Sequence, residues 1–164
     1  MPLKIDFKAG EKMVINGAVL ENIGPNAKII VHNQAAILRE KEVLKVDDCA
    51  TPASRVYFAL QCAYMFPDKE AEYLQSFNKY LGDYVQACPS AADIADSVRA
   101  LVEQQALYKG LRESRKLIAH EVSTLDSFHE GMARISELAD EDDVDIEQID
   151  QLEDETDPLA KTQP

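Results

Sequence analysis

The residue types that most often carry out chemistry are present in this sequence, but their spacing matches no catalytic or metal-binding motif. Three histidines, at positions 32, 120 and 129, are scattered, and the segment LIAHEVST has Thr124 where a zinc-binding HExxH motif needs its second histidine. The six glycines form no phosphate loop of the GxxxxGK[ST] type. Cys49, Cys62 and Cys88 are odd in number and lack CxxC spacing, so we interpret them as small buried hydrophobic residues. The sequence therefore disfavours an enzyme, a metal site and a cofactor.

The remaining candidates are basic residues in two clusters, one near residue 40 and one near residue 112. Positions 109, 112 and 116 are three and four apart, so these side chains project from one face of a helix. Clustered Lys and Arg bind nucleic-acid phosphates by releasing counterions, and exposed tyrosines such as Tyr57, Tyr64 or Tyr108 can stack on single-stranded bases. The alternative for most of these tyrosines is a place in the core. The predicted RNA-binding residues are Arg39, Lys41, Lys45, Arg55, Lys109, Arg112, Arg115 and Lys116. The alternative is a solvated helix face whose cations pair with Glu103 and Glu113.

The first 45 residues have the pattern of a small antiparallel β unit. Turn sequences separate short apolar or alternating segments, and Asn16-Gly17 suits a tight hairpin because both positions tolerate positive φ. The expected strands are LKIDF, KMVI, AVLENI and AKIIV, and a further strand runs out into the basic stretch LREKE. Because Arg39 and Lys41 alternate there with acidic residues, both cations are expected on one side of the extended chain.

After residue 46 the apolar spacing becomes helical. Thr51-Pro52 predicts an N-cap followed by proline at the first helical position, in a helix that ends at Pro67. A second helix is expected from about residue 68 to 88, a long third helix from residue 90 to 118 with Gly110 as a candidate bend, and a last helix at about 127–139. These amphipathic faces offer more apolar surface than a small β unit can cover, so we expect a homo-oligomer, most simply a dimer.

The net charge of −13 is concentrated at the C-terminal end. Residues 1–136 contain 16 Lys and Arg against 18 Asp and Glu, a net charge of −2, whereas residues 137–164 contain twelve acidic residues and one Lys, a net charge of −11. Like charge and few large apolar residues predict disorder in this tail. Two roles remain open: a solubilising tail, or a polyanion that lies over a basic face and competes with phosphate, since attraction still acts over about 8–10 Å at ordinary salt.

No segment predicts membrane insertion or export. The longest apolar candidate, VYFALQCAYMF, is too short to span a bilayer. The N-terminal segment MPLKIDFKAGEK lacks the basic start and apolar run of a signal peptide and alternates like a strand. We therefore expect a cytoplasmic protein.

Four stretches in order, MPLK, GEKMVINGAVLEN, NQAAILREKEV and TPASRVYFALQCAY, resemble the FlbT family of flagellin-synthesis regulators. The resemblance covers roughly residues 1–122; it is dense through residue 64 and includes LYKGLRESRKLIAHE. The chain departs from the family after NGAV, where LENIGPNAKII keeps only Lys28 in place of a basic turn.

This resemblance implies post-transcriptional control of flagellum biogenesis. It implies association with the 5′ untranslated leader of flagellin mRNA and promotion of that message's degradation, with negative or positive sign in different members. A second hypothesis is a protein-binding adaptor or chaperone that engages flagellin or another flagellar regulator and affects the message indirectly. The near-neutral charge of residues 1–136 favours the adaptor more than a strongly basic surface would.

The predicted fold class is α+β. It consists of a small N-terminal antiparallel β unit at residues 1–46, a helical hairpin or bundle packed on it at residues 47–136, and a disordered acidic C-terminal tail at residues 137–164.

Overall fold

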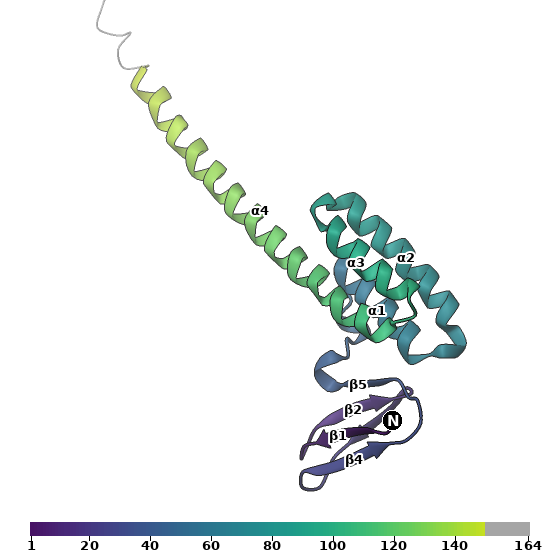
Figure 1. Cartoon of the computed structure of the whole chain (residues 1–164). Coiled ribbons are helices and arrows are strands. Elements are labelled where there is room, and N and C mark those ends of the chain that lie inside the picture. Colours follow the sequence, from purple (N-terminus) through teal and green to yellow (C-terminus); the bar gives the residue numbers. More distant parts are fainter. Residues whose placement is uncertain (150–164) are drawn as a thin grey trace, which may run out of the picture. The chain divides into compact units, whose positions relative to one another are not determined.

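The computed structural model describes the backbone of residues 1–149 and the side chains of residues 1–138. The chain divides into two units, Met1–Glu121 and Val122–Pro164. The first unit begins with five strands, β1 (Leu3–Phe7), β2 (Lys12–Ile15), β3 (Ala18–Glu21), β4 (Ala27–Val31) and β5 (Ile37–Arg39) (Figure 1). The helices α1 (Pro52–Met65), α2 (Glu70–Ala87) and α3 (Ala92–Glu103) follow, and α4 (Leu107–Ile149) starts in the first unit and continues in the second. The predicted order of antiparallel strands followed by helices is confirmed.

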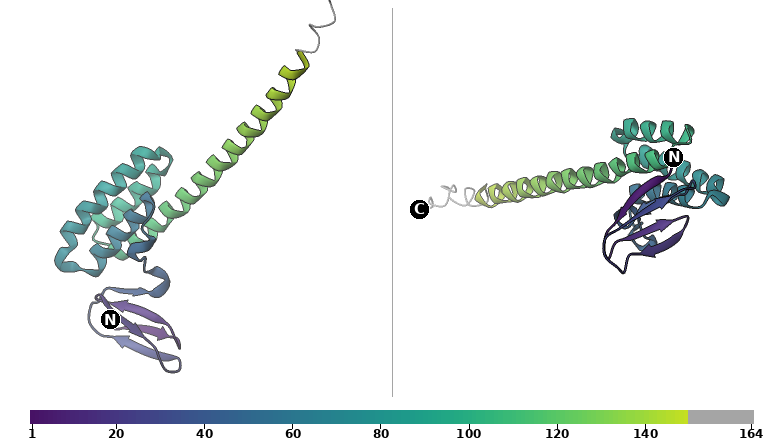
Figure 2. Two further views of the ribbon diagram at one scale, coloured as in Figure 1. Left: turned by 180° about the vertical axis from the view of Figure 1, so that it is seen from behind. Right: turned by 60° about the horizontal axis from the view of Figure 1, so that its bottom comes forward.

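The five strands form two small antiparallel sheets. β1 pairs with β4, and β2 lies between β3 and β5. Asn16 and Gly17 have φ angles of 49° and 83° and join β2 to β3, as the sequence predicted for this hairpin. Ile5, Phe7 and Met13 form a small buried cluster inside the β unit. The strands lie together in each view, and the helices of the same unit form a second group (Figure 2).

The helices of the first unit share a larger core. The Thr51 side chain caps α1 by accepting a hydrogen bond from the Ser54 backbone N–H at 3.2 Å, as Thr51-Pro52 predicted. The largest fully buried side chains of this core include Val56, Leu60, Phe77, Leu81 and Leu111. Four short 3₁₀ turns connect the elements: η1 (Glu40–Glu42), η2 (Val46–Asp48), η3 (Pro67–Lys69) and η4 (Pro89–Ala91).

The predicted long third helix is wrong, because the chain breaks between α3 and α4. Gln105 adopts a positive φ of 59°, and the Ala106 and Gln105 backbone N–H groups donate to the carbonyl oxygens of Leu101 and Val102, both at 2.9 Å. This is a Schellman end to α3. Gly110, the candidate bend, lies in the first turn of α4 after this break, and an added Cβ there would approach Val102 Cγ2 to 3.3 Å. The separate helix predicted near 127–139 is part of α4.

The acidic C-terminal segment is only partly described. The backbone of residues 139–149 continues α4, while the side chains beyond residue 138 and all of residues 150–164 lie outside the described residues. The predicted disordered tail, residues 137–164, lies largely outside the described residues. Among the described residues, no helix has the length and apolar character that crossing a membrane requires.

Candidate nucleic-acid interface

One face of α1 holds the backbone of the β5–α1 linker, residues 40–51. Tyr57 and Gln61 are one helical turn apart and are both buried. The Tyr57 hydroxyl donates to the Glu42 carbonyl oxygen at 2.6 Å. The Gln61 side chain contacts both backbone groups of Leu44, accepting from its N–H at 2.8 Å and donating to its carbonyl oxygen at 2.9 Å. These bonds fix the conformation of the stretch that carries Lys41.

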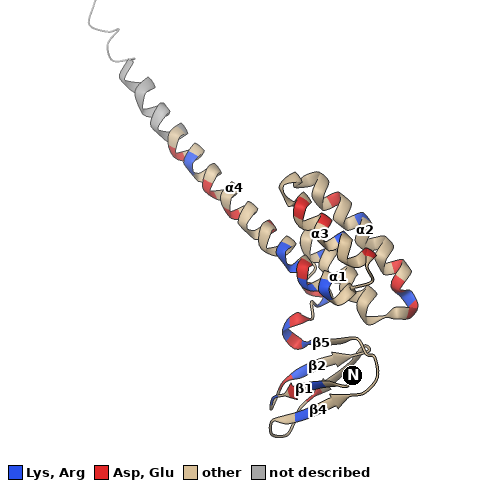
Figure 3. Ribbon diagram, in the orientation of Figure 1, with Lys and Arg blue, Asp and Glu red and all other residues tan. Residues whose placement is uncertain are grey.

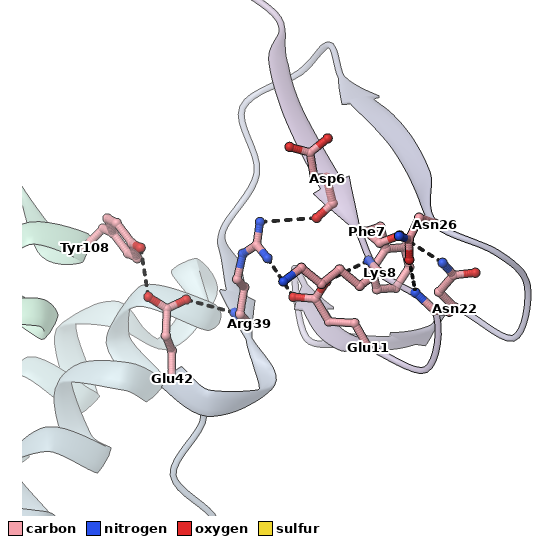
Figure 4. Close-up of polar contacts among 10 residues, drawn as sticks. Asp6, Phe7, Lys8, Glu11, Asn22, Asn26, Arg39, Glu42 and Tyr108 are labelled. Atoms are coloured by element: carbon pink, nitrogen blue, oxygen red, sulfur yellow. Dashed lines mark hydrogen bonds and ion pairs between the residues drawn. The ribbon is translucent and has the colours of Figure 1, made fainter.

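The linker also contacts the first turns of α4 through the side chain of Glu42. One carboxylate oxygen of Glu42 accepts from the Tyr108 hydroxyl at 2.9 Å, and the other accepts from the Arg39 backbone N–H at 2.9 Å (Figure 4). Burial raises the pKa of Tyr108, and its hydrogen bond to Glu42 raises the pKa further. The phenol therefore stays a neutral donor to the carboxylate at physiological pH.

Arg115 makes the second contact between α4 and the linker. Its Nη2 donates to the Lys41 carbonyl oxygen at 2.8 Å, and its Cζ lies 5.9 Å from the centre of the Tyr57 ring. Burial raises the pKa of Tyr57, while the nearby Arg115 cation opposes that shift. The structure thus joins the two basic clusters, which are 74 residues apart in the chain.

Arg112 belongs to the same face of α4. Tyr108, Arg112 and Arg115 are spaced four and three residues apart, and both Tyr108 and Arg115 contact the linker. Arg112 is exposed, and its charge acts on the Tyr108 phenol by lowering the pKa. We name Lys41, Arg112 and Arg115 the junction cluster; all three side chains are exposed and form no ion pair with any described residue.

Two of the predicted RNA-binding residues are engaged in ion pairs. Arg39 Nη1 lies 2.7 Å from Glu11 Oε1, and Arg39 Nη2 donates to the Asp6 carbonyl oxygen at 3.3 Å (Figure 4). The pKa of Glu11 is lowered by a hydrogen bond from the Lys8 backbone N–H and by the Arg39 cation. Lys116 Nζ lies 2.7 Å from Glu113 Oε1, the pairing that the alternative reading of this helix face predicted.

The other three predicted residues are exposed but lie outside the junction cluster. Lys45, Arg55 and Lys109 make no ion pair within the described part of the chain. Lys45 precedes the acidic pair Asp47 and Asp48, and basic and acidic residues alternate along the linker (Figure 3). Residues 40–51 contain two Lys against four acidic residues, a net charge of −2, so Arg112 and Arg115 supply most of the positive charge at the junction.

An open groove of about 740 Å³ adjoins the junction. Tyr64, Tyr108, Lys109 and Gln34 are among the residues that line it. The rings of Tyr64 and Tyr108 are 5.7 Å apart, and Tyr108 is 36% exposed. Of the three tyrosines considered for base stacking, Tyr57 is buried and its hydroxyl donates to the linker. The other two, Tyr64 and Tyr108, border a groove that a base could enter.

His120 sits in a hydrogen-bonded structural network. Its ring nitrogens lie 3.1 Å from the Tyr84 hydroxyl and 3.0 Å from the Ser90 hydroxyl. No cluster of three or more potential metal ligands occurs among the described residues. Hydroxyl groups from α2 and η4 therefore hold the His120 ring in place.

The family model described as "Flagellar protein FlbT" matches residues 3–125. The chain belongs to the FlbT family. A "probable flagellum biosynthesis repressor protein FlbT" from Caulobacter sp. (strain K31) is 33% identical over 123 residues, which cover 74% of this chain and 94% of that protein. The "flagellum biosynthesis repressor protein FlbT" of Caulobacter vibrioides (strain ATCC 19089 / CIP 103742 / CB 15) is 31% identical over 135 residues, which cover 81% of this chain and 96% of that protein.

A third relative, from Bradyrhizobium diazoefficiens, carries the name "probable flagellum biosynthesis repressor protein FlbT 1" and is 33% identical over 122 residues, covering 74% of this chain and 83% of its own. No solved structure matches the chain. The FlbT match includes the linker, α1 and the first turns of α4, so the junction cluster lies inside the family region. Residues 126–164 lie beyond it.

Sequence reasoning missed the residues that build the junction. Gln61 and Glu42 carry no motif, and Tyr57 was predicted as a core residue or as a base-stacking ring, not as a hydrogen-bond donor to the linker. A signal was present: Tyr57, Gln61 and Tyr64 recur at four and three residues on the otherwise apolar α1, and Tyr64 too contacts this region, accepting from the Ile37 N–H at 3.0 Å. The polar ends of side chains at buried positions need hydrogen-bond partners, and here those partners are backbone groups of residues 37–44.

Proposed function

We propose that this protein represses flagellum biosynthesis after transcription, by binding the 5′ leader of flagellin mRNA through the junction cluster and so promoting degradation of that message. Support for repression comes from FlbT membership and from relatives named flagellum biosynthesis repressors. Support for RNA contact comes from one observation above all: the Arg115–Lys41 bond of 2.8 Å brings two basic segments, distant in sequence, to one place.

The arrangement suits phosphate binding. Arg115 uses one N–H on the Lys41 carbonyl oxygen and has the Tyr57 ring beside its guanidinium, so the group is held in one orientation. A guanidinium has five N–H donors, so the remaining edge can bind a phosphate with two parallel hydrogen bonds. Arg112, one turn away, adds a second cation on this face of α4, and the exposed Lys41 adds a third on the linker. Tyr108 at the adjoining groove offers a ring face for an unpaired base.

The expected strength of binding follows from the number of free cations. Residues 1–136 carry a net charge of −2, so long-range attraction is weak and affinity depends on local contacts. Three phosphate contacts to single-stranded RNA give a slope of log K against log salt of about −2. The protein would hold the leader, and a separate nuclease would cut it.

The experiment measures binding of the purified protein to flagellin leader RNA at several salt concentrations. Arg112→Glu and Lys41→Glu should each weaken binding about tenfold or more and reduce the salt slope by about one. Lys79→Glu, the same charge change at an exposed position of α2, is the matched control and should bind like the parent protein. Parent protein that does not bind the leader, or three variants that weaken binding equally, would refute the proposal.

The adaptor function remains the second candidate because the body of the chain is nearly neutral. It predicts co-purification with flagellin or another flagellar regulator and indifference to leader RNA. Removal of residues 139–164 tests the acidic tail in the same assay. Tighter RNA binding at low salt by the shortened chain would support competition with phosphate, and unchanged binding would leave the tail a solubilising role.

A further inference from the structure

A stripe of large apolar side chains runs along the second unit. Within α4, residues 122–138 expose six such side chains. Their exposed fractions are 54% for Val122, 49% for Leu125, 62% for Phe128, 51% for Met132, 62% for Ile135 and 62% for Leu138. Single exposed apolar residues are common, but a contiguous row on one helix marks an interaction surface.

The spacing of the stripe is that of a helix-pairing seam. Leu125, Phe128, Met132 and Ile135 follow one another at three, four and three residues, which is the heptad pattern of a coiled coil. Val122 and Leu138 lie at flanking heptad positions, on opposite edges of this face. A seam of this kind needs a second helix whose side chains fit between its own.

The charged residues of the segment all avoid this face. Asp126, Glu130, Arg134 and Glu137 fall at heptad positions that point away from the seam. The positions that flank the seam are uncharged; they are Val122, Thr124, His129, Gly131, Ser136 and Leu138, with histidine counted as neutral. Charges at the flanking positions normally select one partner over another and keep identical helices apart. Between residues 122 and 138 nothing of this kind opposes the approach of an identical helix.

The helix itself needs such a partner. Ser123, Thr124, Ser127, Gly131 and Ser136 are weaker helix formers than alanine, and a mid-helix glycine alone costs about 1 kcal/mol relative to alanine. In proteins, most of the stability of a helix comes from packing of its apolar face rather than from intrinsic propensity. Residues 122–138 are all in α4, so a packed stripe accounts for their helical conformation.

The exposed area matches what a pair of copies requires. If a fully exposed large apolar side chain offers about 200 Å², the six residues together expose on the order of 600–700 Å² in one chain. Two copies would then bury at most on the order of 1,200–1,400 Å², which reaches the lower end of the range of about 1,200–2,000 Å² for stable specific interfaces.

We propose that residues 122–138 of α4 pair with the same segment of a second copy of this chain, so that the protein is a homodimer held by the Leu125–Ile135 seam. The pairing is independent of what the first unit binds. It gives the segment the packed face that its sequence requires, without any like-charge contact along the seam.

The test measures the mass of the full chain in solution by light scattering and sedimentation at micromolar concentrations. The parent chain should have twice the mass of one chain. Phe128→Glu combined with Met132→Glu should weaken self-association by about 100-fold or more, because four large apolar side chains leave the seam of each dimer. Ser123→Glu combined with Ser127→Glu adds the same charge on the far side of the helix and should leave the dimer intact.

Folding of the first unit is followed in the same variants, through its thermal unfolding. The proposal would be overturned if the parent chain were a monomer or if the dimer survived the Phe128 and Met132 substitutions. It would also be overturned if the Ser123 and Ser127 control lost the dimer while its first unit remained folded. A double variant with Phe128→Ala and Met132→Ala keeps good helix formers at both sites; it should also be a monomer, which separates loss of the seam from loss of the helix.

Discussion

The buried side chain of Gln61 allows the most direct test of how the junction is built. Gln61→Ala removes both hydrogen bonds to Leu44, at 2.8 and 2.9 Å, and leaves the Leu44 N–H and carbonyl oxygen without these partners. Each such bond contributes about 0.5–1.5 kcal/mol net, and unmet partly buried backbone groups add to the loss. We therefore expect the free energy of unfolding to fall by about 2–3 kcal/mol.

Urea denaturation followed by circular dichroism measures this change. A loss of that size lowers the urea midpoint by about 1 M, given a denaturant slope of about 2–3 kcal/mol per molar for a chain of this size. Gln75→Ala on α2 makes the same substitution at an exposed position, and its stability should stay within about 0.5 kcal/mol of the parent protein. Native-state hydrogen exchange adds a local measurement, because the Leu44 amide should exchange faster in Gln61→Ala than in the parent protein.

The reasoning would be refuted by a specific pair of results. If Gln61→Ala changed stability by less than about 0.5 kcal/mol and left the exchange rate of the Leu44 amide unaltered, the linker would be held by other contacts. The Tyr57 bond to Glu42 at 2.6 Å would then be the main support of the linker. Loss of stability without faster exchange at Leu44 would show a general packing role for Gln61 and would also contradict its role in holding the Leu44 backbone.

Three further predictions concern other parts of the first unit. The pKa of Glu11 is lowered, first by the hydrogen bond from the Lys8 backbone N–H and then by the Arg39 cation. The ionised carboxylate therefore stabilises the fold above the ordinary value of 4.5, and this contribution is lost as pH falls through the lowered pKa, so acid unfolding of Glu11→Gln should depend less on pH in that range. Burial raises the pKa of Tyr84 to about 12 from 10.0, so its neutral form stabilises the fold below pH 10 and this contribution is lost toward pH 12. The pKa values of Tyr57 and Tyr108 are raised as well, so ultraviolet titration should show several late-ionising tyrosines, and the one that ionises near pH 12 should be absent in Tyr84→Phe. Glu121, 9% exposed, accepts from the Ala53 N–H at 3.1 Å at the start of α1, so Glu121→Ala should cost about 1–2 kcal/mol in a urea titration.

Local sequence signals were sufficient for the elements whose ends depend on neighbouring residues. Asn16-Gly17 predicted the β2–β3 hairpin, and Thr51-Pro52 predicted the start of α1, because turn and cap chemistry acts within a few residues. The break after α3 escaped prediction because its left-handed residue is Gln105, with no glycine or proline to mark it, and the apolar spacing continues past it.

The candidate site was predictable only in part, for a similar reason. The spacing of residues 109, 112 and 116 placed them on one helix face without any tertiary information. Whether each cation is free depends on contacts distant in sequence, such as Arg39 with Glu11, 28 residues away, and no local pattern reports these. The meeting of Arg115 with Lys41 depends in turn on how the linker is held, and therefore on Gln61 and Tyr57.

The two proposals together make a prediction that neither makes alone. One junction cluster offers three cations, which is few for a chain with a net charge of −13. Two copies joined through residues 122–138 would present two clusters to one leader, and binding at the first would raise the effective concentration of RNA at the second. The double variant Phe128→Glu with Met132→Glu should therefore lose RNA affinity and about half of the salt slope, although both substitutions lie outside the junction cluster. The Ser123→Glu with Ser127→Glu control carries the same added charge, so equal loss in both variants would show charge repulsion rather than loss of the second cluster.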